Sequence, residues 1–481
     1  MKIKLSILLL ASLAAWNLCA SEKSRLIVLA DMGNEPDEEQ QMHHMLLNAN
    51  EFDLEGLIAV TGKYLRVGPR PDLFWHLIEG YEKVYSNLQL HADGYPSPEY
   101  LRGIVASGQR GYGILSTGKH LTNSTGANLI IKAATNGDPR PIWLVVNAGS
   151  NTLAQAVISF QRQSTPEEFA AFLAKFRVFE NGSQDNAGAW ICANFPDIHW
   201  IRSNYQTYCY GGPGNGELGP NVWEPFESSS LGQHHWLLEN VIANHGPFGN
   251  YYPLRQFTKG GVSFAEGGGT IPWLGLVNKG LFDINHPHWG GWSGRFSRQK
   301  LENFWSRHKD IKLDEMTYGT FKLYGEASDH WTNPEDGKVY NNDYAPIFRF
   351  RRAMWNNEKA RNDWCYQPFE SANHHPMAVL NGDAGDSILS MEVKPGESIT
   401  LDASGSSDPD GDELVFYWWN YFEAGSYPRP LVLDKSSAKK TSFTVPSDAA
   451  GKEIHLVLEI HDVNEIANLY DYRRLVLTVS R

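Results

Sequence analysis

Short apolar runs alternate with amphipathic, helix-forming stretches through the first third of the chain. The apolar runs have the length and β-branched content of buried strands, and each is followed by a segment with helical periodicity. The predicted strand segments lie at 25–31, 54–61, 141–149 and 176–182, and the predicted helices at 40–50, 71–84, 151–160 and 187–195. This order predicts an α/β fold with a mostly parallel sheet flanked by helices, whose ligands bind where strands end and helices begin.

Residues 208–294 differ from this pattern because glycine-rich loops replace the alternation. Loops of such length inside a domain are usually functional or lid-like. Their aromatic content favours contact with a ligand over disorder, since disordered segments are poor in aromatic residues.

The pattern changes again after about residue 370, where apolar residues occupy every second position. Ile454, Leu456, Leu458 and Ile460 follow this period of two, which is typical of strands with one buried face. Turn residues separate several such runs, as in a small all-β sandwich domain. A chain of 481 residues also exceeds the usual size of one core. The predicted division is a signal peptide at 1–20, an α/β domain at 21–370 and an Ig-like or PKD-like β-sandwich at 371–481.

The first twenty residues have the features of a secretory signal peptide. Lys2 and Lys4 precede an apolar run that ends in small residues, and cleavage is expected after Ala20. Lipid modification at Cys19 is the alternative, but the residues before it fit that processing poorly. No later stretch is long and apolar enough to span a membrane, so we expect a periplasmic or secreted protein.

Charge and cysteine content narrow the classes further. The formal net charge is −13 and becomes more negative when the signal peptide is removed, which argues against nucleic-acid binding. The cysteines show no paired spacing of a zinc or redox site. Cys192 and Cys209 are compatible with a disulfide or with buried free thiols, and both alternatives stay open.

An acidic turn, VLADMGNEPDEEQQ at residues 28–41, follows the first predicted strand. Asp31 is expected at the carboxyl end of that strand, with Gly33 permitting a sharp turn. Asp37 and Glu38 fall at the start of the next helix, where the helix dipole favours carboxylates. Clustered oxygen ligands without histidine or cysteine suit Ca²⁺ better than zinc.

This turn resembles the amino-terminal aspartate motif of nucleoside hydrolases, in the extended form of an exported bacterial group often labelled cellulose-binding proteins. The resemblance extends over VNAGSNTLAQAV, QDNAGAWICANFPDIHWIRS, FAEGGGTIPWL, HPHWGGWSGRF and the DPDGD segment of the β-domain. It implies a hydrolase scaffold, calcium as cofactor, and a carbohydrate or nucleoside-like substrate.

The resemblance also implies roles for individual residues. Asp31 would be a calcium ligand and the general base, with Asp37 contacting a sugar hydroxyl and Glu38 supplying a second metal ligand. The related motif more often ends in two aspartates, so Glu38 departs from it. Asn147 occupies the place of a residue whose backbone carbonyl binds the metal.

A second matching region, FRVFENGSQDNAGAW, corresponds to the part of these enzymes that binds sugar hydroxyls. It implies Asn181, Gln184, Asp185 and Asn186 as substrate contacts. Asp185 is equally well explained as a helix cap, whereas Gln184 has no such structural explanation.

The match weakens at the last metal ligand, because the expected His-Asp pair is missing from the loop region. Asp283, His286 and His288 are available replacements, and Glu266 is the first choice because its FAEGGG turn follows a strand-like segment. His286, His288 and Trp289, in a glycine-flanked loop, are predicted substrate contacts. The missing pair leaves two functions open: an inverting calcium-dependent glycosidase, or a carbohydrate-binding protein without turnover. Asp408, Asp410 and Asp412 read as an acidic turn slightly better than as a second calcium site, and the oligomeric state does not follow from the sequence.

Overall fold

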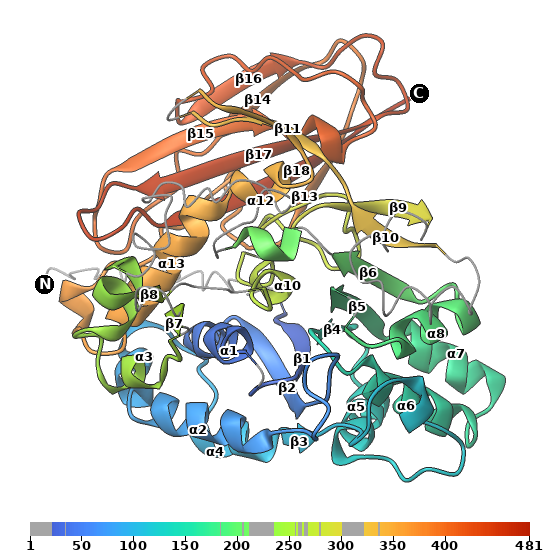
Figure 1. Ribbon diagram of the computed structural model, residues 1–481. Helices are drawn as coiled ribbons and strands as arrows, with labels where there is room; N and C mark the ends of the chain where they lie inside the picture. Colours follow the sequence, from blue (N-terminus) through green and yellow to red (C-terminus); the bar gives the residue numbers. More distant parts are fainter. Residues whose placement is uncertain are drawn as a thin grey trace, which may run out of the picture.

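The computed structural model describes residues 22–33, 35–182, 184–203, 206–210, 235–254, 256–257, 262–263, 268–278, 280–300, 322–334 and 337–481. Figure 1 shows an α/β domain (blue to yellow) below a β-sandwich (orange to red). Helix α13 (Arg351–Asp363) lies between the two parts. The expected signal peptide lies outside the described residues.

An eight-stranded sheet forms the centre of the α/β domain and confirms the predicted fold class. Its strand order is β3-β2-β1-β4-β5-β6-β10-β9, and all neighbouring pairs are parallel except β10 with β9. The strands are β1 (Ser24–Ala30), β2 (Phe52–Ala59), β3 (Val105–Ser107), β4 (Ile142–Val146), β5 (Phe176–Asn181), β6 (His199–Ser203), β9 (Phe296–Lys300) and β10 (Lys322–Glu326). The chain order reverses at β1, because β2 and β3 add on one side and β4 to β6 on the other.

Helices cover both faces of this sheet. Alternate residues of β1 show the division, since Leu26 and Val28 join one core cluster and Ile27 and Leu29 the other. The first face carries α1 (Asp37–Leu47), α2 (Pro71–Glu82), α3 (Tyr85–His91), α4 (Pro98–Gly103), α10 (Ile271–Leu274), α12 (Ala345–Phe348) and α13. The second face carries α5 (Thr125–Thr135), α6 (Ser150–Gln161), α7 (Pro166–Ala174) and α8 (Ala187–Asn194).

Most predicted elements of this region are present with small shifts of their ends. The predicted helix at 40–50 begins three residues earlier as α1, because three acidic residues occupy its first turn and interact favourably with the helix dipole. The helices at 71–84 and 187–195 are also observed, as α2 and α8. Strands β9 and β10 and the short pair β11 (Asp329–Thr332) and β12 (Val339–Asn342) were not predicted.

The carboxyl-terminal part is the predicted β-sandwich. One sheet has the order β13-β18-β17-β15, and β14 pairs with β16 opposite it. These strands are β13 (Leu389–Val393), β14 (Ser398–Asp402), β15 (Leu414–Asn420), β16 (Lys440–Thr444), β17 (Glu453–Asp462) and β18 (Tyr470–Val479). The alternating residues of β17, including Ile454 and Ile460, fill the core of the sandwich as predicted.

The central strands of the larger sheet, β17 and β18, are buried on both faces. Trp418 packs in the sandwich core, whereas Trp419, one residue further, faces the α/β domain, where it packs against Phe350 and the guanidinium of Arg349. Tyr472 of β18 also joins the core cluster of the α/β domain. The two parts of the chain therefore share a continuous apolar contact.

Two further expectations are settled by the described residues. Cys192, Cys209 and Cys365 are buried and form no disulfide, so the structure contradicts the alternative of a disulfide between Cys192 and Cys209. No helix among the described residues is long and apolar enough to cross a membrane.

A buried carboxyl group joins α13 to the rest of the α/β domain. Glu358 accepts a hydrogen bond from the hydroxyl of Tyr210, which also lies 3.2 Å from Nδ1 of His44 on α1. Burial raises the pKa of Glu358 to about 7. The folded protein therefore keeps this proton to a higher pH than the unfolded chain does.

This difference predicts how stability changes with pH. Because the folded-state pKa of Glu358 is raised, its contribution to stability falls as the pH rises from the ordinary carboxyl range to about 7. Glu358→Gln removes this dependence, so its melting temperature relative to wild type should be higher at pH 8 than at pH 5. Thermal unfolding at both pH values measures this difference. Glu99→Gln at an exposed position is the control, and an equal offset of Glu358→Gln at both pH values would contradict the assignment.

Candidate active site

The candidate site lies where the strand order of the parallel sheet reverses. Asp31 directly follows β1, and Asn147 directly follows the neighbouring strand β4. The loops after these strands lead to α1 on one face of the sheet and to α6 on the other, and ligands usually bind between such loops, at the carboxyl ends of the strands. The sheet topology therefore places the acidic turn where binding is expected.

Asp31 is enclosed by the loops that follow β1, β2 and β4. Its side chain is only 5% exposed. A Cβ atom on Gly62, in the loop after β2, would lie 2.2 Å from Oδ2 of Asp31 and 2.9 Å from the Cβ of Ala148. Glycine at position 62 is therefore required by the close approach of the Asp31 carboxylate.

Four carboxyl groups of the acidic turn contribute to one another's electrostatics. Burial and the negative charges of Asp37 and Glu35 raise the pKa of Asp31 to about 7. Burial, Asp37 and Asp31 raise the pKa of Glu38 well above its ordinary value. Mutually repelling buried carboxylates favour either a proton or a bound cation.

Glu38 connects this turn to the loop after β4. Its Oε2 accepts a hydrogen bond of 2.9 Å from Nδ2 of Asn147 and lies 3.5 Å from Nε2 of Gln41. The side-chain oxygen of Asn147 is buried without a hydrogen-bond partner. This orphaned acceptor beside two carboxylates fits the oxygen donor set that Ca²⁺ prefers. We refer to Asp31, Asp37, Glu38 and Asn147 as the Asp31 site.

Asn181, the last residue of β5, extends the same edge. Its Nδ2 donates to the backbone oxygen of Gly268 at 3.1 Å, and its Oδ1 is buried without a partner. A Cβ on Gly269 would lie 2.5 Å from Nδ2 of Asn147. Gly268 and Gly269 therefore reach the site, whereas Glu266, the predicted last metal ligand, lies outside the described residues.

The predicted sugar contacts after β5 differ in their surroundings. Asp185 accepts hydrogen bonds from the backbone nitrogens of Ala187 at 2.7 Å and Gly113 at 3.3 Å. Oδ1 of Asn186 accepts from the nitrogen of Ile114 at 2.9 Å. These contacts hold the 111–114 loop against the start of α8. Gln184 is half-buried, and its backbone oxygen accepts from the nitrogen of Lys63.

The structure does not bring His286, His288 and Trp289 to the Asp31 site. Arg177, near the start of β5, donates to Oδ1 of Asn285 at 2.8 Å, which places this loop at the amino ends of the strands. The Trp289 ring stacks on His286, with ring centroids 4.0 Å apart, and meets the edge of His455 of the sandwich, with centroids 5.1 Å apart. This loop therefore fills the domain interface, a position that the residue types alone do not indicate.

An acidic group that could hold a metal occurs in the β-sandwich. Among the described residues, Asp408, Asp410 and Asp412 bring carboxylate oxygens within 4.8 Å of one another. Both oxygens of Asp410 lie within hydrogen-bonding distance of the His374 side chain, and Asp412 accepts from Asn464 at 2.6 Å. These partners fit the acidic turn that the sequence favours slightly over a metal site.

Three supporting residues were missed at the sequence level. Gly62 and Gln41 touch the carboxylates, and Glu180 accepts hydrogen bonds from Nε1 of Trp200 at 2.9 Å and Nε of Arg202 at 2.6 Å beside Asn181. Of these three, only Glu180 could have been found from the sequence, because a charged residue inside an apolar strand indicates a buried ion pair.

Comparison with known proteins identifies the family of this chain. Residues 25–296 match the family model described as cellulose-binding Sde182, nucleoside hydrolase-like domain. Residues 398–479 match the model of the cellulose-binding protein Sde0182, C-terminal domain. The chain therefore belongs to the nucleoside hydrolase-like Sde182 family, as the resemblance of its motifs implied.

Among solved structures, the chain is similar to a nucleoside hydrolase-related hypothetical protein from Saccharophagus degradans that is associated with carbohydrate metabolism. The identity is 35%, over 95% of this chain and 100% of that chain, with a TM-score of 0.79. An endo-beta-1,4-mannanase from Thermotoga petrophila has 10% identity over 90% of this chain and 100% of that chain, but the TM-score of 0.14 indicates no similarity of fold. None of the curated proteins compared matches the chain.

The ion pair that supports Asn181 leads to a stability prediction. Arg202 and Glu180 are both buried, so Glu180→Gln leaves the guanidinium charge without its carboxylate. The free energy of unfolding should fall by roughly 3–5 kcal/mol in a denaturant titration. Glu82→Gln, which breaks the exposed pair with Arg102, should leave it nearly unchanged. If both substitutions lowered the free energy of unfolding equally, burial would not be the reason that the Glu180–Arg202 pair matters for stability.

Proposed function

We propose that this protein is an exported, calcium-dependent hydrolase of furanosyl or related glycosidic bonds, with Asp31 as the general base. The observation that carries the proposal is the buried group of Asp31, Glu38 and Asn147 at the switch point of the sheet. The family model and the carbohydrate association of the similar structure support a sugar as the substrate. Export is proposed from the signal-peptide features of the first twenty residues.

The residues of the Asp31 site fit a calcium ion. Asp31 and Glu38 would supply carboxylate oxygens and Asn147 an amide or carbonyl oxygen. When bound, the ion would supply positive charge that offsets the mutual repulsion of the carboxylates and orients water and sugar hydroxyls. Asn147 holds Glu38 in place through its Nδ2, which restrains the donor set before binding.

The chain's own groups suggest how hydrolysis would proceed. Asp31 is nearly buried and would accept a proton from a water molecule that attacks the anomeric carbon. The glycosidic bond would break in the same step, with the leaving group taking the bonding electrons and then a proton from solvent. Asp37 and Asn181 would bind sugar hydroxyls at the edge of the site. Direct attack by water, without a covalent intermediate, inverts the configuration at the anomeric carbon.

A carbohydrate-binding protein without turnover is the second candidate. The description of the matching family as cellulose-binding favours it, as does the missing His-Asp pair in the loop region. Both candidates use the same crevice, so the separating measurement is turnover.

The first test replaces the proposed base. Asp31→Asn keeps the shape of the side chain but cannot accept the proton, so hydrolysis of p-nitrophenyl furanosides and nucleosides should fall by about 100-fold or more. Sugar release by wild type should also stop when calcium is chelated. Asp197→Asn, at an exposed turn, is the control and should keep full activity. If wild type itself hydrolyses none of these substrates but binds sugars, the non-catalytic candidate is correct.

The second test disturbs the site without changing a carboxylate. Gly62→Ala places a methyl group against Oδ2 of Asp31 and the Cβ of Ala148, and should weaken Ca²⁺ binding by about tenfold or more in calorimetric titration. Gly103→Ala is the matched control, because a Cβ there meets nothing within 4 Å. Unchanged calcium affinity in Gly62→Ala would refute the proposed metal position.

A further inference from the structure

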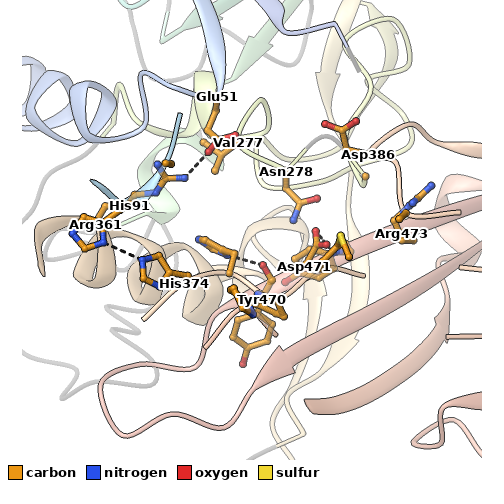
Figure 2. Close-up of a pocket in the computed structure, with 18 of the residues that line it drawn as sticks. Glu51, His91, Val277, Asn278, Arg361, His374, Asp386, Tyr470, Asp471 and Arg473 are labelled. Atoms are coloured by element: carbon orange, nitrogen blue, oxygen red, sulfur yellow. Dashed lines mark hydrogen bonds and ion pairs between the residues drawn. The ribbon is translucent and has the colours of Figure 1, made fainter. Parts of the chain in front are cut away.

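A second cavity, of about 530 Å³, lies between the α/β domain and the β-sandwich. Its walls combine a loop of the α/β domain at Val277–Asn278, the end of α13, the segment that follows it and strand β18 (Figure 2). This volume is within the range of small-molecule sites. We call it the interdomain cavity. None of the residues of the Asp31 site lines it.

Asn278 lines this cavity and has a side-chain carbonyl oxygen without a hydrogen-bond partner. Its side chain is 6% exposed, and this oxygen, Oδ1, is buried. Figure 2 shows the side chain extending from the α/β domain toward Tyr470 and Asp471 of the sandwich. A buried carbonyl oxygen without a partner costs free energy, and a hydroxyl group of a ligand in the cavity would donate the missing hydrogen bond to Oδ1.

The charges around the cavity are already balanced. Arg361 donates to Glu51 at 2.5 Å, and Arg473 donates to Asp383 at 2.8 Å. Both oxygens of Asp471 accept backbone hydrogen bonds, from Ala378 at 2.7 Å and Tyr472 at 2.8 Å. Both guanidinium groups already pair with carboxylates, which disfavours an anionic ligand. Both oxygens of Asp471 already accept hydrogen bonds, which disfavours a metal ion.

Unused hydrogen-bonding capacity nevertheless remains in the wall. The Nε atoms of Arg361 and Arg473 are buried without partners, in addition to Oδ1 of Asn278. Residues of the wall thus hold one unused acceptor and two unused donors, all three buried beneath its surface, so a ligand reaches them through small side-chain movements. A hydroxyl group both donates and accepts, so a ligand rich in hydroxyl groups matches this set.

An aromatic ring forms part of the rim. Phe369 stacks on His374 at 4.0 Å and keeps 37% of its surface exposed. His374 is held in turn by Asp410 and by Nδ1 of His91 at 2.9 Å, which makes the position of the ring rigid. An exposed aromatic face beside hydrogen-bonding groups suits the apolar face of a sugar ring.

We propose that the interdomain cavity is a second binding site, separate from the Asp31 site, for a neutral oligosaccharide that bonds Asn278 and stacks on Phe369. The site draws on both parts of the chain, since Asn278 belongs to the α/β domain and Arg473 to the sandwich. Ligand binding therefore strengthens the contact between them.

The test uses the full-length mature chain carrying Asp31→Asn, so that the first site cannot turn over its ligand. Calorimetric titration with cellotetraose, xylotetraose and mannotetraose should reveal saturable binding of at least one of them. Adding Asn278→Ala should weaken that affinity by about tenfold or more, because it removes a buried hydrogen bond. Asn285→Ala, an exposed asparagine of the same chain region outside the cavity, is the matched control and should change nothing.

Phe369→Ala at the rim provides an independent check and should also weaken binding, even if Asn278→Ala fails to fold. The proposal is overturned if none of the three sugars binds, or if Phe369→Ala and a folded Asn278→Ala bind as tightly as their parent. An equal loss in Asn285→Ala would overturn it too. Failure of turnover at Asp31 in wild type would affect only the proposed hydrolase, because this titration does not depend on catalysis.

Discussion

Repulsion between buried carboxylates is the constraint on which the candidate site depends. Asp31 and Glu38 lie in a crevice where water cannot screen them, and their pKa values are raised by burial and by neighbouring negative charges. The fold maintains this arrangement through Gly62, which leaves room for Asp31, and Asn147, which holds Glu38. Such a group is stabilised by positive charge, which the proposed calcium ion would supply.

The β-sandwich is joined to the α/β domain by the same physical means that build its own core. Strands β17 and β18 present one apolar face to the sandwich and a second face to the first domain, where Val457 and Tyr472 are buried. Arg474 of β18 donates to the backbone oxygens of Leu281 at 2.9 Å and Gly290 at 2.9 Å. The loop that carries His286 and Trp289 packs within this domain interface. The interdomain cavity lies elsewhere between the same two parts.

Much of the fold followed from local pattern. The alternation of apolar strands and amphipathic helices predicted the parallel sheet, and the period of two predicted the sandwich, because both patterns reflect which face is buried. Strands β9 to β12 were missed, since short polar strands such as Phe296–Lys300 carry no clear periodicity. Trp418 and Trp419 show what local pattern cannot predict. Strand alternation places the two side chains on opposite faces of the sheet, but it does not indicate that another domain covers the second face.

The sequence by itself determined the acidic turn after the first strand, its oxygen-rich chemistry and the family to which the chain belongs, because these depend on residue types at short spacing. The resemblance of the motifs already implied that Asn147 and Asn181 belong with Asp31. Only the tertiary structure decided that the His286–Trp289 loop lies at the opposite ends of the strands and that Asn278 and Arg473 line one cavity. Such pairings join residues tens to hundreds of positions apart, and strand order and domain packing, rather than local propensity, bring them together.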